Sequence, residues 1–376
     1  MPRRGENIRK RKDGRWEGRI KDGKDINGKT KYKSIYAWSY TELRQAMKKY
    51  EKAVKKKGAG NQNISLEKMC YDWLKEIEIT VKQSTYARYT FSIEKHILPY
   101  FGARSIYELS KADIEEFIKV KTERFRLGQK GGLSPKSIKD LICILTQILK
   151  YGERNGFSIG FEYKFLQPSV QRPETQVLTI DEQKRFIKYV KENLNHENVG
   201  VLICLYTGIR LGELCALTWK DIDLQSGTLK ISKTLQRIPA SEGVRKTKII
   251  IDQPKSKNSN RKIPIPAFLL KDLRNLSSRY DTEAYVLTGQ KNRFIEPRTY
   301  QNKFKKYLKL AQMPDINFHA LRHTFATRAV ENDFEIKSLS EILGHATVNF
   351  TLDRYVHSSE ELKKMEMNKM AACYLG

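Results

Sequence analysis

Apolar residues recur at helical spacing through most of the chain, and this periodicity limits the fold to one built mainly of helices. Between residues 64 and 155, four such stretches follow one another, and a serine that can cap a helix precedes each of them. These serines are Ser65, Ser84, Ser110 and Ser134, the last of which is followed by Pro135 at the first helical position. Pro99 is expected to end the second helix. We therefore predict a four-helix domain over residues 64–155, either a bundle that grips DNA or a plain helical bundle.

The first sixty residues have a different pattern, in which short strand-like runs alternate with turns. The runs are Lys10–Lys12, Trp16–Ile20 and Lys31–Tyr36, and the turn dipeptides between them are Asp13-Gly14 and Asn27-Gly28. A helical pattern then extends over residues 41–56 and ends before Gly58. This order predicts a small domain over residues 1–57, made of a three-stranded sheet and one helix.

The last part of the chain is again mainly helical. After a linker expected at 156–175, the helical pattern resumes near Thr179 and continues to about Trp219. A hairpin region is expected from three runs, Thr228–Ile231, Ile249–Asp252 and Arg261–Ile265, with a turn at 258–260, and helices follow from Phe268. We expect one domain over 176–360 and a tail helix over 361–376. The predicted fold class is therefore mainly α with small β parts (α+β).

Positive charge is the strongest indication of a partner. The chain has 71 Lys and Arg residues against 43 Asp and Glu residues, a net charge of +28. Residues 1–60 alone hold 20 basic and 7 acidic residues, a balance of +13 on about a sixth of the chain. Such a density is typical of a module that neutralises phosphates, so we expect nucleic acid as the partner. The alternative is a soluble basic protein without a polyanionic partner.

Several classes of protein are disfavoured. The longest apolar run, Val199–Tyr206, has the length of a buried helix and not of a membrane span. Arg3 and Arg4 lead into further charge and not into an apolar signal core, so we expect a cytoplasmic protein that acts at the nucleoid and binds no membrane. The five cysteines form no C-x-x-C pair, which argues against a disulfide scaffold or a zinc ribbon.

Two familiar kinds of site are also disfavoured. No G-x-x-x-x-G-K-[ST] motif is present, so no nucleotide triphosphate site of that type is expected. His319 and His323 have the i, i+4 spacing of a zinc helix, but Ala320 stands where the general-base glutamate would be, and Arg322 would put a positive charge beside the metal. We expect neither a metal nor any other cofactor.

The residues left for chemistry are cations and one phenol. Arg210 follows a wholly apolar helical run, His319 and Arg322 share one helix face, His345 follows a predicted helix end, and Tyr355 comes ten residues later. Each has an ordinary interpretation when taken alone. Arg210, for example, can be a surface arginine that pairs with Glu213 at i+3.

Taken together, these motifs resemble the tyrosine recombinase (phage-type integrase) family. The resemblance is carried by Thr207–Glu213, Pro254–Pro264, His319–Thr327, Leu343–His345 and Thr351–Tyr355, in that order over 176–360. Residues 84–89 and 97–102 resemble the core-binding domain of the same family. The first domain resembles the arm-binding domain of integrases from conjugative transposons and related phages.

The resemblance implies a set of roles in breaking and rejoining DNA. Arg210 and Arg322 would hold the scissile phosphate, and His345 would hydrogen-bond it. His319 would assist the phenol as a base or through a cationic field, and Tyr355 would attack to give a 3′-phosphotyrosyl link. Lys255 would protonate the leaving 5′-oxygen, with Lys257 as the runner-up. Glu213 is expected to orient Arg210, His323 to be structural, and ATP and metal to be unnecessary.

The expected partners are double-stranded DNA of core type and arm type, further copies of the chain in a tetramer on DNA, and an accessory excision or DNA-bending protein. The tail at 361–376 is expected to dock on a neighbouring subunit. Besides Lys257, the candidate DNA-binding residues are Arg15, Trp16, Arg19, Lys31, Lys33, Thr85, Arg88, Lys136, Lys139 and Arg261. Two alternatives stay open, namely a DNA-binding protein that keeps the fold without cutting and a type IB topoisomerase.

Overall fold

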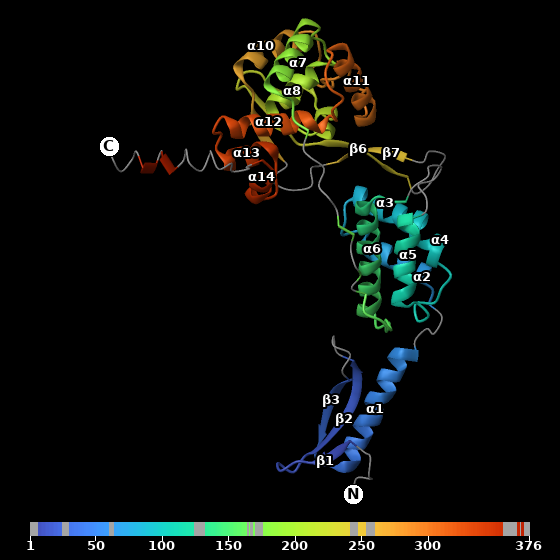
Figure 1. Cartoon of the computed structure of the whole chain (residues 1–376). Coiled ribbons are helices and arrows are strands. Elements are labelled where there is room, and N and C mark those ends of the chain that lie inside the picture. Colours follow the sequence, from blue (N-terminus) through green and yellow to red (C-terminus); the bar gives the residue numbers. More distant parts are fainter. Residues whose placement is uncertain are drawn as a thin grey trace. The chain divides into compact units, whose positions relative to one another are not determined.

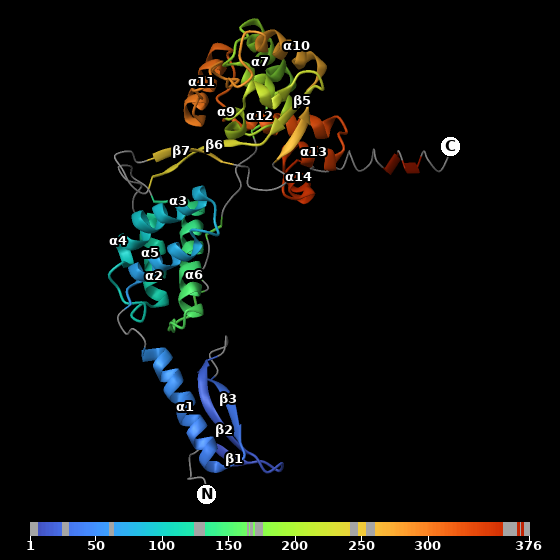
Figure 2. The same ribbon diagram turned by 180° about the vertical axis from the view of Figure 1, so that it is seen from behind.

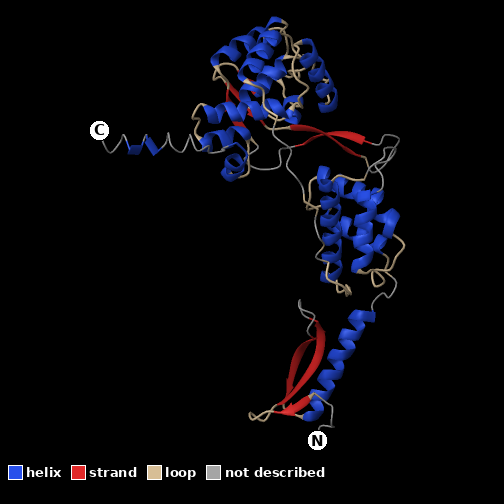
Figure 3. Ribbon diagram, in the orientation of Figure 1, coloured by secondary structure: helices blue, strands red, loops and turns tan. Residues whose placement is uncertain are grey.

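The computed structural model describes residues 7–24, 30–59, 64–123, 132–163, 165, 168–169, 176–240, 247–252, 260–355, 367–368 and 370–371. The chain divides into two compact units, Met1–Gln171 and Arg172–Gly376. Figure 3 shows that helices predominate and that the strands form small separate groups, which confirms the predicted fold class. Among the described residues, no helix combines the length and apolarity needed to cross a bilayer.

The first unit begins with an antiparallel sheet and one helix. The strands are β1 (Ile8–Lys10), β2 (Trp16–Lys24) and β3 (Thr30–Ala37) in that spatial order, and α1 (Tyr40–Ala59) lies along one face of the sheet (Figure 1). Gly18 allows this close approach, since a Cβ there would lie 2.2 Å from the sulfur of Met47 in α1. The three strands and the helix agree with prediction. The first strand, however, ends at Lys10 and not at Lys12, because the turn around Gly14 already begins at Arg11.

The first unit continues with a helical bundle. Its elements are α2 (Leu66–Ile77), α3 (Gln83–Ser92), the π-helix η1 (Ile93–Ile97), α4 (Leu98–Phe101), α5 (Lys111–Glu123) and α6 (Pro135–Arg154). The side chains of one face of each helix meet in a single core. Its largest fully buried members are Trp73, Phe101 and Phe117.

Three of the four predicted serine caps are confirmed. Ser65 and Ser134 each accept a backbone hydrogen bond at the start of α2 and α6, and Ser110 exchanges hydrogen bonds with Asp113 at the start of α5. The prediction for Ser84 was wrong, because α3 already begins at Gln83 with Lys82 in the capping position. Pro99 does not end the second helix either. The π-turn η1 shifts the hydrogen-bond ladder so that Pro99 falls in the first turn of α4, where no backbone N–H is needed.

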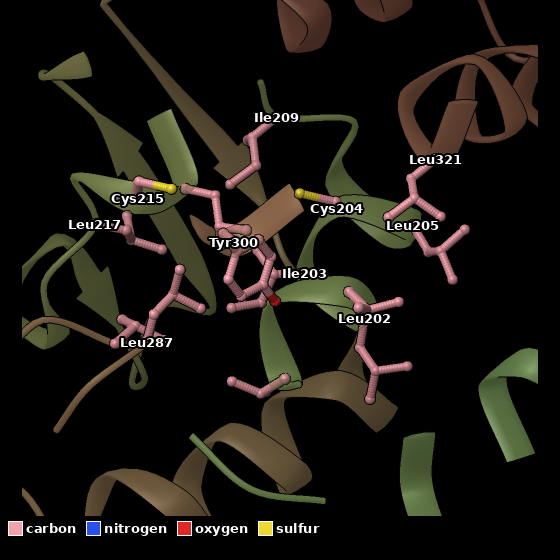
Figure 4. Close-up of a cluster of buried hydrophobic side chains, with 14 of the residues drawn as sticks. Leu202, Ile203, Cys204, Leu205, Ile209, Cys215, Leu217, Leu287, Tyr300 and Leu321 are labelled. Atoms are coloured by element: carbon pink, nitrogen blue, oxygen red, sulfur yellow. The ribbon is translucent and has the colours of Figure 1, made fainter. Parts of the chain in front are cut away.

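In the second unit, helices surround one buried helix. They are α7 (Ile180–Glu192), α8 (Val199–Thr207), α9 (Leu211–Cys215), α10 (Ala267–Ser277), α11 (Pro297–Leu310), α12 (His319–Glu331), α13 (Ile336–Leu343) and α14 (Val348–Tyr355), with a 3-10 turn η2 at Trp219–Asp221. All of α8 except Tyr206 is buried. Figure 4 shows Leu202, Cys204 and Leu205 of this helix among side chains such as Tyr300 and Leu321 from α11 and α12.

The strands of the second unit pair differently from the prediction. β4 (Ile222–Asp223), β5 (Thr228–Ile231) and β8 (Arg261–Pro264) form one antiparallel sheet, while β6 (Thr234–Pro239) and β7 (Thr247–Asp252) form a separate hairpin (Figure 2). The expected pairing of 249–252 with 261–265 was wrong, because β7 pairs with β6, a strand that the sequence analysis missed. The expected turn at 258–260 falls mainly outside the described residues.

Candidate active site

Arg210 is positioned by the end of the buried helix α8. Gly208 follows the helix with a left-handed backbone (φ +63°), and a Cβ at this position would lie 2.5 Å from Phe325, so both the conformation and the space favour glycine. The chain reverses here and starts α9, with Arg210 as its N-terminal capping residue. The Arg210 side chain thus follows directly from a helix that is almost wholly buried.

Glu213 holds Arg210 in two ways, as the sequence suggested. Oε2 of Glu213 accepts the backbone N–H of Arg210 at 2.9 Å, and Oε1 accepts an amino N–H of the guanidinium, also at 2.9 Å. Burial raises the pKa of Glu213, whereas hydrogen bonds from Arg261 and the charges of Arg261 and Arg210 lower it. The lowering effects are larger, so the net pKa lies below the ordinary value. Glu213 is therefore a carboxylate that orients an arginine.

Three consecutive carbonyls at the C-terminal end of α13 each accept a hydrogen bond from a different arginine. The pairs are Ile342 with Arg261 at 2.5 Å, Leu343 with Arg322 at 2.8 Å and Gly344 with Arg210 at 3.0 Å. The last carbonyls of a helix have no partner within it and carry partial negative charge, so they attract cations. The helix end thereby gathers the positive groups of the site.

Arg261 occupies a different environment from the one expected. It was predicted to bind DNA, but its side chain is buried, with its guanidinium on both carboxylate oxygens of Glu213 and on the carbonyl of Ile342. These contacts link strand β8 to α9 and α13. The buried Arg261 side chain thus stabilises the packing of these elements, and nothing in its described contacts supports binding to DNA.

Arg322 lies at the centre of the cluster and is 3% exposed. It donates to the carbonyl of Gly208 at 2.7 Å, to that of Leu343 at 2.8 Å and to Nε2 of His345 at 2.8 Å. Burial, followed by the charge of Arg210, lowers the pKa of Arg322 to about 9, which leaves the guanidinium charged at neutral pH. The predicted pairing of His319 and Arg322 on one helix is confirmed, since both belong to α12.

His345 has both ring nitrogens engaged. Nε2 accepts from Arg322, so the ring proton is on Nδ1, which donates to the hydroxyl of Thr351 at 2.7 Å. Burial and the charges of Arg322 and Arg210 lower the pKa of His345 to about 3. The ring is therefore neutral, with Nε2 as an acceptor and Nδ1 as a donor.

Tyr355 is the last residue of α14 and its ring packs on the cluster. The phenol oxygen lies 2.9 Å from Nδ1 of His323, and the ring stacks on His345 with 6.3 Å between the centroids. Burial raises the pKa of Tyr355, while the nearby charges and hydrogen bonds of Arg322 and Arg354 oppose the rise. The contact with His323 was not predicted from the sequence, although the i, i+4 spacing of His319 and His323 placed both histidines on one helix, α12.

His319 is exposed at the edge of the cluster, and its ring meets that of His323 edge to face at 4.5 Å. Loss of hydration and the charges of Arg322 and Arg210 lower the pKa of His319 to about 4, so the imidazole is neutral at pH 7. Within the described part of the chain, no hydrogen bond to its ring nitrogens and no metal-binding group of three His, Cys, Asp or Glu residues is found. Lys255 and Lys257 lie outside the described residues.

The candidate DNA-binding residues of the sheet fall on different surfaces. Arg19 is exposed on the face away from α1, and Arg15 lies at the turn with its guanidinium on Asp13. Trp16 and Lys33, in contrast, lie on the α1 side, against the rings of Tyr40 and Tyr50. For Lys31, only the backbone is described.

The open face of the sheet holds an arginine group that the sequence analysis missed. Glu17 is 3% exposed, and its carboxylate lies 2.7 Å from Arg9, 3.8 Å from Arg11 and 3.6 Å from Arg19. The exposed ring of Tyr36 lies under Arg11, with 5.5 Å between guanidinium and ring centroid. Alternation along β2 was the available signal, because it puts Glu17 and Arg19 on one face.

In the helical bundle, the candidate cations are accessible. Arg88, Lys136 and Lys139 are exposed, and Thr85 is half-buried in α3. Arg88 lies 3.8 Å from Asp140, a distance at which exposed charges interact weakly. These side chains are therefore available for contact with a polyanion.

Comparison with protein families gives two matches. The model of the "Phage integrase family" matches residues 176–361, and that of the "Phage integrase, N-terminal SAM-like domain" matches residues 65–121. Among curated proteins, the chain is 29% identical over 360 residues to a "Tyrosine recombinase XerC-like" protein of Caldanaerobacter subterraneus, which covers 89% of this chain and 90% of that protein. It is 26% identical over 288 residues to the "Transposase from transposon Tn916" of Enterococcus faecalis, covering 72% of this chain and 68% of that protein.

Two solved structures are also similar. The Tn1549 transposon integrase in complex with transposon right end DNA aligns with a TM-score of 0.65 and 22% identity, covering 82% of this chain and 100% of that one. A lambda integrase dimer bound to a core site aligns with a TM-score of 0.55 and 16% identity, covering 96% and 99%. At these identities, the two structures establish a shared fold.

Proposed function

Because the chain belongs to the phage integrase family of tyrosine recombinases, we propose that it cuts and rejoins DNA at specific sites through Tyr355, in the integration and excision of a mobile element. The observation that carries the proposal is the place of the Tyr355 oxygen. It lies beside His323 and Arg322, within a cluster whose charges suit a phosphate. The charges of Arg322 and Arg354 oppose the rise in the pKa of Tyr355 that burial causes, and so help the phenol to ionise and attack phosphorus.

The arginines supply most of the stabilisation in this proposal. The transition state of phosphodiester cleavage adds negative charge to the nonbridging oxygens, and guanidinium groups of fixed geometry can hold that charge with paired hydrogen bonds. Arg210 and Arg322 are fixed in this way by Glu213 and by helix-end carbonyls. The two guanidinium groups therefore need little rearrangement, and little free energy, to bind the phosphate in the transition state.

The histidines act as neutral groups. His319 has an exposed ring and a pKa of about 4, so it can accept a hydrogen bond or a proton but supplies no cationic field at pH 7. Of the two options left by the sequence, the electrostatics favour the base. His345 can donate to a phosphate oxygen once Nε2 has released Arg322 and the ring proton has moved from Nδ1 to Nε2.

The leaving 5′-oxygen takes its proton from Lys255, with Lys257 as the runner-up. Both belong to the segment between β7 and β8, which follows directly from the hairpin at Asp252. Cleavage forms a 3′-phosphotyrosyl bond and a free 5′-hydroxyl. The ester conserves the bond energy, so the reverse step rejoins a strand without ATP.

DNA is bound by both units. The basic sheet domain, with the Arg9, Arg11 and Arg19 group, takes arm-type sites, and the bundle together with the second unit takes core-type sites. Lambda integrase, which has a similar fold, has been solved as a tetramer bound to a Holliday junction. We infer the same assembly here, in which the tail at 361–376 docks on a neighbouring subunit. An accessory excision or DNA-bending protein sets whether integration or excision occurs. The protein acts in the cytoplasm.

A nicked suicide duplex tests the proposal. The full chain is mixed with a nicked duplex of its recombination site, and a denaturing gel is examined for a protein–DNA adduct. We expect an adduct that Tyr355→Phe abolishes while DNA binding persists. Tyr206→Phe, a change at a half-buried tyrosine that packs on Phe268 away from the cluster, is the matched control and should retain the adduct.

Other outcomes identify the alternatives. DNA binding without any adduct would indicate a binding protein that keeps the fold, and relaxation of supercoiled DNA without a specific site would indicate a type IB topoisomerase. An adduct that survives Tyr355→Phe would overturn the assignment of the nucleophile.

A further inference from the structure

His323 contacts the atom that the proposed function makes the nucleophile. Its Nδ1 lies 2.9 Å from the phenol oxygen of Tyr355, and the residue is 5% exposed. His319, the histidine that the family resemblance singled out, meets His323 but has no hydrogen bond to Tyr355 among the described residues. The nearest imidazole to the nucleophile is therefore the one for which the sequence predicted only a structural part.

The direction of this hydrogen bond follows from the other side of the ring. An amino nitrogen of Arg354 lies 3.3 Å from Nε2 of His323. A guanidinium only donates, so Nε2 must accept, and the single proton of a neutral imidazole is then on Nδ1. Nδ1 consequently donates to the oxygen of Tyr355.

The second histidine of the cluster repeats the arrangement. Arg322 donates to Nε2 of His345, and Nδ1 of His345 donates to the hydroxyl of Thr351. In both cases an arginine fixes the tautomer and the imidazole passes a hydrogen bond to a hydroxyl oxygen. The order arginine, histidine, hydroxyl is thus a common feature of the site.

The surroundings keep His323 neutral. The groups that face Tyr355 and His323 are Arg322 and His319 from α12, His345 from the segment after α13, and Arg354 from α14. Burial and this positive field lower the pKa of His323 to about 3. Because Nδ1 of this neutral imidazole already carries the ring proton, it cannot take one from the phenol, but its N–H is well suited to an oxygen that gains negative charge.

We propose that His323 is a positioning residue that donates its Nδ1 proton to the Tyr355 oxygen, holding the nucleophile and favouring the phenolate, while Arg354 fixes its tautomer. The inference rests on the proposed function of Tyr355. During cleavage, the phenol proton passes to His319, the base of the proposed function, the oxygen–phosphorus bond to Tyr355 forms, and the bond from phosphorus to the 5′-oxygen breaks. The leaving oxygen takes a proton from the general acid, and His323 retains its own.

Two substitutions separate this role from a base and from a packing role. His323→Asn keeps an N–H donor near the position of Nδ1 but cannot titrate, and His323→Leu removes the donor. The single-turnover rate of adduct formation is measured on the nicked duplex between about pH 6 and 10, a range that spans ionisation of a phenol. DNA binding by gel shift and thermal unfolding are measured for each variant of the full chain.

We expect His323→Leu to slow adduct formation roughly ten- to a hundredfold, the size of one hydrogen bond to a charged oxygen. Its rate should also rise at higher pH than that of the wild type, because the phenolate has lost a donor. His323→Asn should keep the wild-type pH dependence and lose no more than about threefold in rate, a small fraction of that hydrogen bond. His196→Leu, at a histidine that contacts Tyr280 outside the cluster, is the matched control and should change neither quantity.

The proposal is overturned by either of two results. If His323→Asn is as slow as His323→Leu and the pH profiles of both variants shift, the ring is required as a base. If both variants lose rate equally at every pH, without a shift of the profile, the residue only packs. Failure of the proposed function is distinguishable, because either the wild-type chain would then form no adduct or Tyr355→Phe would still form it in the same assay.

Discussion

The carboxylate of Glu213 and the guanidinium of Arg261 form a buried ion pair, with 2.9 Å between Oε2 of Glu213 and an amino nitrogen of Arg261. The same carboxylate orients Arg210. Strand β8 is thereby tied to the start of α9, where Arg210 lies, one of the two arginines that we propose to bind the phosphate. Stability and the geometry of the site are consequently coupled through one acidic residue.

Glu213→Gln should destabilise the second unit strongly. Removing one partner of a buried pair leaves Arg261 charged without compensation, which costs about 3–5 kcal/mol in the free energy of unfolding. Urea unfolding of the full chain, monitored by the transition of the second unit, measures the loss. Glu283→Gln, which breaks an exposed pair with Lys220, is the matched control and should cost about 0–1 kcal/mol. Equal losses in the two variants would contradict the prediction.

The contribution of Glu213 should depend on pH in one direction. Its pKa in the folded chain lies below the ordinary 4.5, so the carboxylate stabilises the fold above that value and loses its contribution as the pH falls through the folded pKa. The difference in unfolding free energy between wild type and Glu213→Gln should therefore be constant near pH 7 and shrink in acid. A difference that grows as the pH falls from 7 to 4.5 would show that burial dominates and that the folded pKa is raised.

The contacts of Glu213 show what the sequence can predict and what it cannot. The contact between Glu213 and Arg210 follows from helical spacing, which local sequence determines. The contact with Arg261 depends on the pairing of β5 with β8, and alternation identifies strands without identifying their partners. For the same reason, β7 was assigned to the wrong neighbour, and its true partner β6 was missed.

The site shows the same division between local and distant contacts. The sequence placed Arg210, His319, Arg322, His345 and Tyr355 in motifs, and the structure brings Arg210, Arg322, His345 and Tyr355 together, with His319 at the edge. Nothing in the sequence indicated that three carbonyls at the end of α13 would each accept a hydrogen bond from an arginine, because backbone groups have no sequence signature. The link from His323 to Tyr355 depends on how α14 packs on α12, which is a tertiary property.

Arg322→Lys and Arg210→Lys should both impair cleavage, because an ammonium lacks the planar fork of a guanidinium. We expect single-turnover adduct formation to fall roughly a hundredfold or more in each, the loss seen when a transition-state donor is removed. Arg322→Lys should also lower the thermal stability more, since Arg322 is 3% exposed and serves two helix-end carbonyls. Cleavage within a fewfold of wild type in either variant, with DNA binding unchanged, would be inconsistent with the proposed phosphate contacts.

A bridging sulfur in the DNA should identify the general acid. Sulfur in place of the 5′-oxygen leaves as a thiolate, which has a far lower pKa than an alcohol and needs no proton. Lys255→Ala should therefore be slow on ordinary DNA and close to wild type on the sulfur-containing duplex, whereas Tyr355→Phe should be inactive on both. If Lys257→Ala and not Lys255→Ala is rescued, the runner-up is the acid.

Thr351→Val tests whether the tautomer of His345 matters. The hydroxyl of Thr351 is fully buried and accepts the Nδ1 proton of His345, and valine has the same shape without the acceptor. The unpaired N–H should cost about 1–3 kcal/mol in the free energy of unfolding. It should also weaken the hold of Arg322 on Nε2, because the ring can now carry its proton on either nitrogen, and so slow adduct formation. Thr347→Val, at an exposed threonine nearby, is the matched control. A Thr351→Val variant with unchanged stability and cleavage would mean that the hydrogen bond to His345 does not fix the ring.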